Sequence, residues 1–179
     1  MKCAIMIFVI FISIAGAQQT KIEVSTPTAP GDSLPNSAAV PEVYAVENHF
    51  QRVEVVRLKF GSDLLKGLER IVGEEKIVNG VILSGIGSVR SYHFHCVSNR
   101  DFPSRNICVD NPASSADIAC MNGYVIGGRV HAHILFSDSD KAFGGHLEPG
   151  TSVFTFAIVT IGVLSDTVDL SRLDDKTYR

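Results

Sequence analysis

The stretch GRVHAHILFSDSDKAFGGHLE, residues 128–148, decides the fold, because it joins two apolar runs across a short polar break. The break, residues 137–141, favours a tight turn, and the runs on either side favour strands. We therefore predict an antiparallel hairpin that turns near Ser139. In such a hairpin the numbers of paired residues sum to about 279, which places His146 opposite His133 and Glu148 opposite His131.

Three histidines are brought together by this predicted hairpin. His131 and His133 are two residues apart, so they leave the same face of a strand roughly 6.5–7 Å apart, and His146 joins them from the second strand. Three neutral imidazoles without a thiolate are typical of an open zinc site, in which water or substrate takes the fourth position. The pattern predicts zinc, or another divalent metal, on His131, His133 and His146. Glu148 is predicted to act as a catalytic base or to orient a ligand.

Other interpretations of the histidines stay open at this point. The three side chains could form a polar stripe on a solvated sheet face. His93 and His95 form a second His-x-His pair that no third histidine accompanies, and we interpret it as a surface or interface feature. A nucleophilic pair of Cys96 and His95 is disfavoured, because adjacent residues of a strand face opposite sides.

The segments around the hairpin predict one helix among at least five strands. In residues 53–60, Val56, Leu58 and Phe60 alternate with charged residues, as in a half-buried strand. Asp63 then offers a helix N-cap, and leucines at helical spacing predict an amphipathic helix that ends near Glu75. Further strands are predicted at residues 81–88, 92–97, 123–136 and 151–164, with a long loop at 99–118. The fold class predicted is α+β, with a largely antiparallel sheet and one main amphipathic helix.

The N-terminal part of the chain predicts export. Lys2, the apolar run of residues 4–14 and Ala15-Gly16-Ala17 are typical of a cleaved signal peptide at residues 1–17. The apolar run is shorter than the roughly 20 residues that span a bilayer, so no membrane span is expected after cleavage. Residues 18–45, rich in Pro, Ser and Thr, predict a disordered linker, and residues 46–179 the folded domain. The predicted location is the periplasm or the outside of the cell.

The composition disfavours one class of partner, and the cysteine content leaves two arrangements of the thiols open. The chain has 179 residues, 45% of them hydrophobic, with 19 acidic and 16 basic side chains. A weakly acidic protein has no overall field to attract phosphates, so the composition disfavours nucleic acid as a partner. Cys96, Cys108 and Cys120 remain after signal cleavage. One disulfide with a free thiol, or three buried thiols, are both open.

From about Val53 to Leu164 the chain resembles the PPC domain, the plants and prokaryotes conserved module also found in AT-hook nuclear-localised proteins. The resemblance implies an α+β domain that forms a homotrimer. In similar prokaryotic members it implies a metal, usually zinc, on His131, His133 and His146. Acetolactate decarboxylase, a zinc protein, shares the fold superfamily. The segments that carry the resemblance are residues 56–64, 84–88, 128–133 and 144–147, with Gly150 and residues 153–155.

Two departures from the family pattern bear on function. Ile158 follows Ala157 where many prokaryotic members have an acidic residue, and the chain has no Arg-Gly-Arg-Pro hook. The leading hypothesis is an exported homotrimer that binds zinc and acts as a hydrolase or lyase on an unknown small carbonyl or ester molecule. The alternatives are a DNA-binding protein and a non-catalytic structural trimer.

Overall fold

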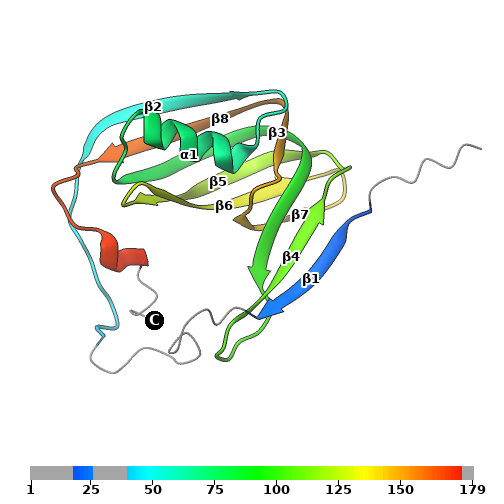
Figure 1. The fold of residues 1–179 in the computed structure, drawn as a ribbon, viewed down its shortest axis with the longest axis horizontal. Helices are drawn as coiled ribbons and strands as arrows, with labels where there is room; N and C mark the ends of the chain where they lie inside the picture. The colour runs from blue at the N-terminus through cyan, green and yellow to red at the C-terminus, as the bar shows by residue number, and fades with distance from the viewer. Residues whose placement is uncertain (1–17, 26–39, 175–179) are drawn as a thin grey trace, which may run out of the picture.

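The computed structural model describes residues 18–25 and 40–174 of the chain (Figure 1). The predicted signal peptide, residues 1–17, and residues 26–39 of the predicted linker lie outside this part. One α-helix, α1, spans Leu64–Glu74, and a short 3-10 helix, η1, spans Ser171–Asp174. The strands are β1 (Thr20–Ser25), β2 (Phe50–Lys59), β3 (Gly80–Val97), β4 (Arg105–Asn111), β5 (Ala116–Ile126), β6 (Arg129–Ser137), β7 (Ala142–Leu147) and β8 (Ser152–Leu164).

Strand β3 organises the sheet, in which all the pairings are antiparallel. Its first half pairs with β5 and β8, and its second half pairs with β4 and β7 (Figure 1). Because β5 pairs with β6 and β6 with β7, the strands β3, β5, β6 and β7 close into a ring. Tyr92, Phe94, Phe136 and Phe143 pack together, with ring centroids 5.0–6.2 Å apart. This aromatic cluster belongs to the main core.

Helix α1 forms where the sequence predicts it. The Asp63 side chain accepts a hydrogen bond from the backbone N–H of Lys66 at 3.0 Å, so Asp63 is the N-cap. The helix lies along the face of the sheet that presents buried Leu58, and it contacts β2, β6 and β8 (Figure 1). Its buried side chains are the apolar positions expected from helical spacing: Leu64, Leu65, Leu68 and Val72.

The α+β fold class predicted from the sequence is wrong. Among the described residues, one α-helix of 11 residues stands against eight strands, so the fold is largely β. Two segments contain more strand than their sequence patterns predicted. Residues 99–118, predicted as a loop, contain β4 and the start of β5, and the strands predicted at 81–88 and 92–97 are one strand, β3. Pro103 and Pro112 lie on either side of β4 and do not interrupt it. Because proline is typical of turns, the whole segment around them was predicted as a loop.

Part of the predicted linker is a strand in the structure. Residues Thr20–Ser25 form β1, which pairs with β4 at the edge of the sheet (Figure 1). Its apolar side chains stay exposed, with Ile22 at 60% and Val24 at 37%. A strand that pairs only through its backbone needs no buried apolar stripe, so sequence periodicity does not reveal it.

Two further properties of the described residues bear on the predictions. Cys96, Cys108 and Cys120 are free thiols, and two of them, Cys96 and Cys120, are exposed. Neither alternative predicted for the cysteines, a disulfide or three buried thiols, describes this arrangement. In residues 18–25 and 40–174, no helix combines the length and the apolar character that crossing a membrane requires.

Candidate metal centre

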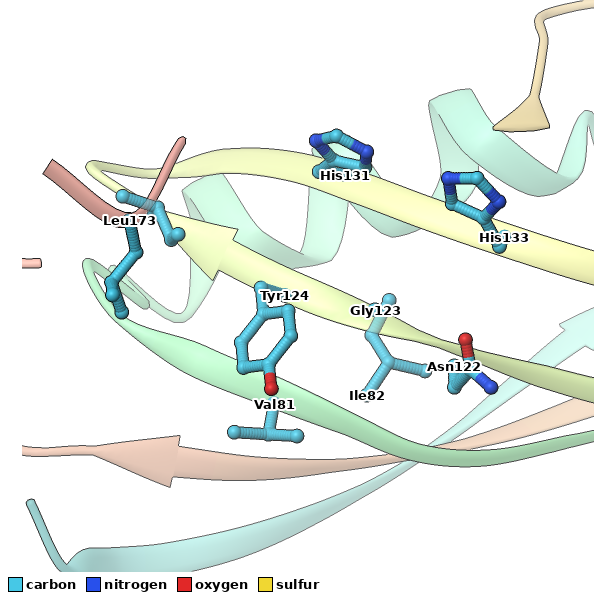
Figure 2. Close-up of a pocket in the computed structure, with 9 residues that line it drawn as sticks. Val81, Ile82, Asn122, Gly123, Tyr124, His131, His133 and Leu173 are labelled. Atoms are coloured by element: carbon cyan, nitrogen blue, oxygen red, sulfur yellow. The ribbon is translucent and has the colours of Figure 1, made fainter. Parts of the chain in front are cut away.

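The hairpin predicted from the sequence is confirmed by strands β6 and β7. His133 pairs with His146 and Ser137 pairs with Ala142, as the predicted register requires. His131 and His133 lie side by side on β6, with ring centroids 5.6 Å apart (Figure 2). One ligand nitrogen from each of His131, His133 and His146 lies within 4.8 Å of the other two. The three imidazoles therefore converge on one region of the sheet surface.

Two glycines place His146 between two strands. A Cβ atom on Gly144 would overlap the carbonyl oxygen of Ile134 in β6, and one on Gly145 would overlap the carbonyl oxygen of His95 in β3. Without these Cβ atoms β7 approaches both neighbours closely. The next residue, His146, then pairs with His133 on one side and with His95 on the other.

His95 also belongs to the cluster, although its sequence pattern did not predict this. The rings of His95 and His146 are stacked, with centroids 4.6 Å apart and planes 28° apart. No sequence spacing could reveal this contact, because it depends on β7 pairing with β3 about 50 residues upstream. His93, two residues away, is placed differently, since its Nδ1 lies 2.8 Å from the carbonyl oxygen of Pro149.

The predicted position of Glu148 opposite His131 is wrong. After His146 the chain leaves β6 and continues along β3, where the backbone N–H of Glu148 donates to the carbonyl oxygen of His93 at 3.0 Å. The carboxylate Oε1 of Glu148 lies 2.5 Å from Nδ1 of His95. The prediction assumed two strands paired to their ends, whereas β7 changes partner. Glu148 consequently belongs beside His95.

The electrostatic environment keeps the central rings neutral. Burial, followed by the nearby His95 and His131, lowers the pKa of His146 to about 4. Burial, followed by His131, also lowers the pKa of His133. Metal binding needs neutral imidazoles, so both rings are ready to coordinate at neutral pH. Burial and the Glu148 charge raise the pKa of the Cys108 thiol, which therefore stays protonated. A set of three imidazole ligands fits zinc or a similar divalent cation.

The pKa of His146 predicts how the stability of the metal-free protein depends on pH. In the unfolded chain the ring has its ordinary pKa of 6.5, whereas the folded protein resists protonation down to about 4. Between these values the unfolded state binds more protons, so stability falls as the pH falls. Because the ring is only partly buried, solvent screening reduces the effect, and we expect a loss of ~1 kcal/mol between pH 7 and pH 5.

Urea denaturation in the presence of a chelator checks this expectation. The matched variant is His146→Gln, which lacks the titrating ring and should lose less stability over the same interval. Equal losses in the wild type and the variant would contradict the prediction.

A pocket of about 550 Å³ adjoins the histidines. In the β5–β6 register Tyr124 lies across from His131 and Asn122 across from His133, so all four side chains share one face (Figure 2). The phenol and the amide are its polar groups besides the imidazoles. The apolar part of the lining consists of Val81, Ile82, Ile126 and Leu173. The pocket thus combines an apolar wall with a few polar groups, as small-molecule sites do.

Solved structures of similar fold come from several prokaryotes. A metal-containing protein from Archaeoglobus fulgidus is 23% identical with a TM-score of 0.56, over 69% of this chain and 86% of that one. A plant- and prokaryote-conserved protein from Pyrococcus horikoshii is 20% identical with a TM-score of 0.57, over 69% and 85%. A candidate DNA-binding protein from Bacteroides thetaiotaomicron is 18% identical with a TM-score of 0.52, over 65% and 83%. At these identities the likeness shows the fold alone.

Curated sequence relatives and a family model also match parts of this chain. The bifunctional protein GlmU of Synechococcus sp. strain JA-3-3Ab is 28% identical over 137 residues, which are 75% of this chain and 20% of that protein. The GlmU protein of strain JA-2-3B'a(2-13) is 26% identical over 112 residues, 62% of this chain and 16% of that protein. The chain thus spans at most about a fifth of the length of these curated relatives. The model of the Plants and Prokaryotes Conserved (PCC) domain, also written PPC, matches residues 45–165, more than half of the chain, and the chain therefore belongs to this family.

Proposed function

We propose that this PCC-domain protein binds a divalent cation, zinc in the first instance, through His131, His133 and His146. The observation that carries the proposal is the convergence of three ligand nitrogens within 4.8 Å on a shared face. The lowered pKa values of His133 and His146 support it, because these rings compete little with protons at neutral pH. The metal-containing protein of similar fold from Archaeoglobus fulgidus is consistent with it.

Metal analysis of the untagged protein tests the proposal. We expect about one divalent metal per chain, retained through gel filtration and lost when His131, His133 and His146 are all replaced by alanine. His49→Ala is a matched control, because His49 lies outside the groups that could hold a metal. Retention of the metal by the triple variant would refute the site.

The proposed reaction is hydrolysis or lyase cleavage of a small carbonyl or ester substrate in the pocket beside His131 and His133. A bound zinc would supply Lewis-acid chemistry to such a substrate. Tyr124 and Asn122 would orient it by hydrogen bonds, and the apolar lining would exclude water from it. Glu148 holds the His95 ring through Nδ1, so it positions a member of the cluster. Its role as a base stays a prediction.

We also propose that the protein assembles as a homotrimer, and an exposed apolar face supports this. The face lies on β2, β8 and β3, on the side of the sheet away from α1. Cross-strand pairing puts residues 55 and 160, 57 and 158, and 86 and 158 on the same side. Exposed apolar side chains gathered on one face favour an interaction site, and here Arg57 and Lys59 lie among them. The exposed side chains are Val53 (55%), Val55 (69%), Ile86 (55%), Phe154 (46%) and Phe156 (37%).

A charge placed on this face should break the assembly. Val55→Asp puts a carboxylate at its most exposed apolar position, and burying that charge against a second copy would be costly. We expect a monomer by light scattering where the wild type is a trimer. The matched control is Val97→Asp, because Val97 is 67% exposed and lies on the far end of β3. A wild-type monomer, or equal masses of the two variants, would contradict the proposal.

Export to the periplasm or beyond is proposed from the N-terminal pattern at residues 1–17. N-terminal sequencing of the protein recovered from cells tests it. A mature chain that begins at Gln18 is the expected result.

DNA binding is the second candidate function. The similar fold of a candidate DNA-binding protein from Bacteroides thetaiotaomicron weighs against the expectation that the composition disfavours nucleic acid as a partner. In this chain Arg52, Arg57 and Lys59 are exposed on β2. A measurement of duplex affinity against salt discriminates the two functions, because phosphate contacts would cause a steep loss of binding as salt rises.

A further inference from the structure

Two members of the cluster, His95 and Glu148, are not used by the three-histidine site. His95, His146 and Glu148 also present one ligand atom each within 4.8 Å of one another. None of these residues is fully exposed, and the side chains of His95 and Glu148 are 24% and 27% exposed. Because all three side chains are partly exposed, a cation can reach this second set.

The backbone around Glu148 holds the second set rigidly. The N–H of Glu148 donates to the carbonyl oxygen of His93. The hydroxyl of Thr151, a fully buried residue, lies 3.0 and 3.3 Å from the carbonyl oxygens of His93 and Glu148, which share its single proton. These bonds fix the backbone of Glu148 against β3, the strand that carries His95, as a preformed ligand site requires.

We propose that His95, His146 and Glu148 form a second divalent-cation site that shares His146 with the three-histidine site. The proposal rests on the proposed function in one respect, since both sites use His146. Two imidazoles and one carboxylate are a ligand set typical of Fe²⁺ and related divalent cations, whereas three imidazoles favour zinc. The second set also carries the negative charge of Glu148, which the first set lacks.

Sharing His146 decides how the two sites are occupied. A neutral imidazole has one nitrogen lone pair for coordination, because its other nitrogen carries a proton. His146 therefore serves one cation at a time, and the wild-type chain is expected to hold one cation at either site. For His95, the ionised carboxylate of Glu148 accepts a hydrogen bond from Nδ1, which leaves the lone pair on Nε2.

Two complementary variants of the untagged, full-length chain separate the sites. His131→Ala/His133→Ala breaks the three-histidine site and spares the second set. We expect it to bind about one Co²⁺ per chain in equilibrium dialysis against Co²⁺ alone. Addition of Glu148→Gln or of His95→Ala to this variant should weaken binding at least 100-fold, because loss of an outer-shell partner alone costs about 10–100-fold. Circular dichroism verifies that each variant is folded.

The outcomes are distinct for the two proposals. The second site is overturned if folded His131→Ala/His133→Ala binds no Co²⁺, or if it binds equally well after Glu148→Gln. The opposite variant, His95→Ala/Glu148→Gln, should keep one Co²⁺ on the three histidines. Loss of binding there alone would refute the three-histidine site and leave the second site standing. His93→Ala, on the same strand, is the matched control and should bind as the wild type does.

Discussion

Replacement of Gly144 by alanine is expected to destabilise the protein by at least about 3 kcal/mol and to abolish cation binding at the three-histidine site. The added Cβ would overlap the backbone carbonyl oxygen of Ile134, which cannot move as the end of a flexible side chain can. Overpacking typically lowers stability by about 1–3 kcal/mol, and we expect a clash with the backbone of a paired strand to cost at least the upper value. Relief of the overlap requires β7 to move away from β6, which carries His146 away from His133. Urea denaturation and Co²⁺ binding measure the two effects.

The same substitution at Gly73 is the matched control. Gly73 lies in α1, and a Cβ there would meet no atom within 4 Å. Alanine is a better helix former than glycine, so Gly73→Ala should raise stability by up to about 1 kcal/mol and leave cation binding unchanged. Unchanged stability and binding in Gly144→Ala would show that β7 is not held between its neighbours as described.

Replacement of His146 by alanine is expected to remove all measurable cation binding from a folded chain. His146 is the one histidine that belongs to both groups of candidate ligands among the described residues, and its ring contacts those of His95, His131 and His133. His131→Ala removes one group only, so it should keep weaker binding. We expect His146→Ala to lower affinity at least 100-fold more than His131→Ala does, by equilibrium dialysis.

The fold should tolerate this change because the His146 side chain is only partly buried and lies on the surface of the sheet. Thermal unfolding of His146→Ala establishes that the chain remains folded. If His146→Ala binds a cation as tightly as His131→Ala, His146 is not the shared ligand.

Local features of the chain are predictable where they depend on neighbours in sequence. The α1 helix follows from its N-cap and its apolar spacing, and the β6–β7 hairpin follows from its turn and alternation. The predicted fold class was wrong because the sequences of β1 and β4 alternate only weakly between apolar and polar residues. Strand β1 pairs with β4 through the backbone, and the sequence of β1 does not reveal this pairing. Periodicity reports which side chains are buried, and an edge strand can pair without burying any.

In the candidate site, too, some residues are predictable from the sequence and others depend on the tertiary structure. Alternation and a turn determine that His131, His133 and His146 share a face, since this geometry is contained in one hairpin of about 20 residues. The positions of His95 beside His146 and of Glu148 beside His95 depend on the tertiary structure alone. Both follow from β7 exchanging β6 for β3 as its partner, an event set by close backbone packing at Gly144 and Gly145. Contacts between segments far apart in sequence depend on the packing of the whole sheet, and no local pattern encodes them.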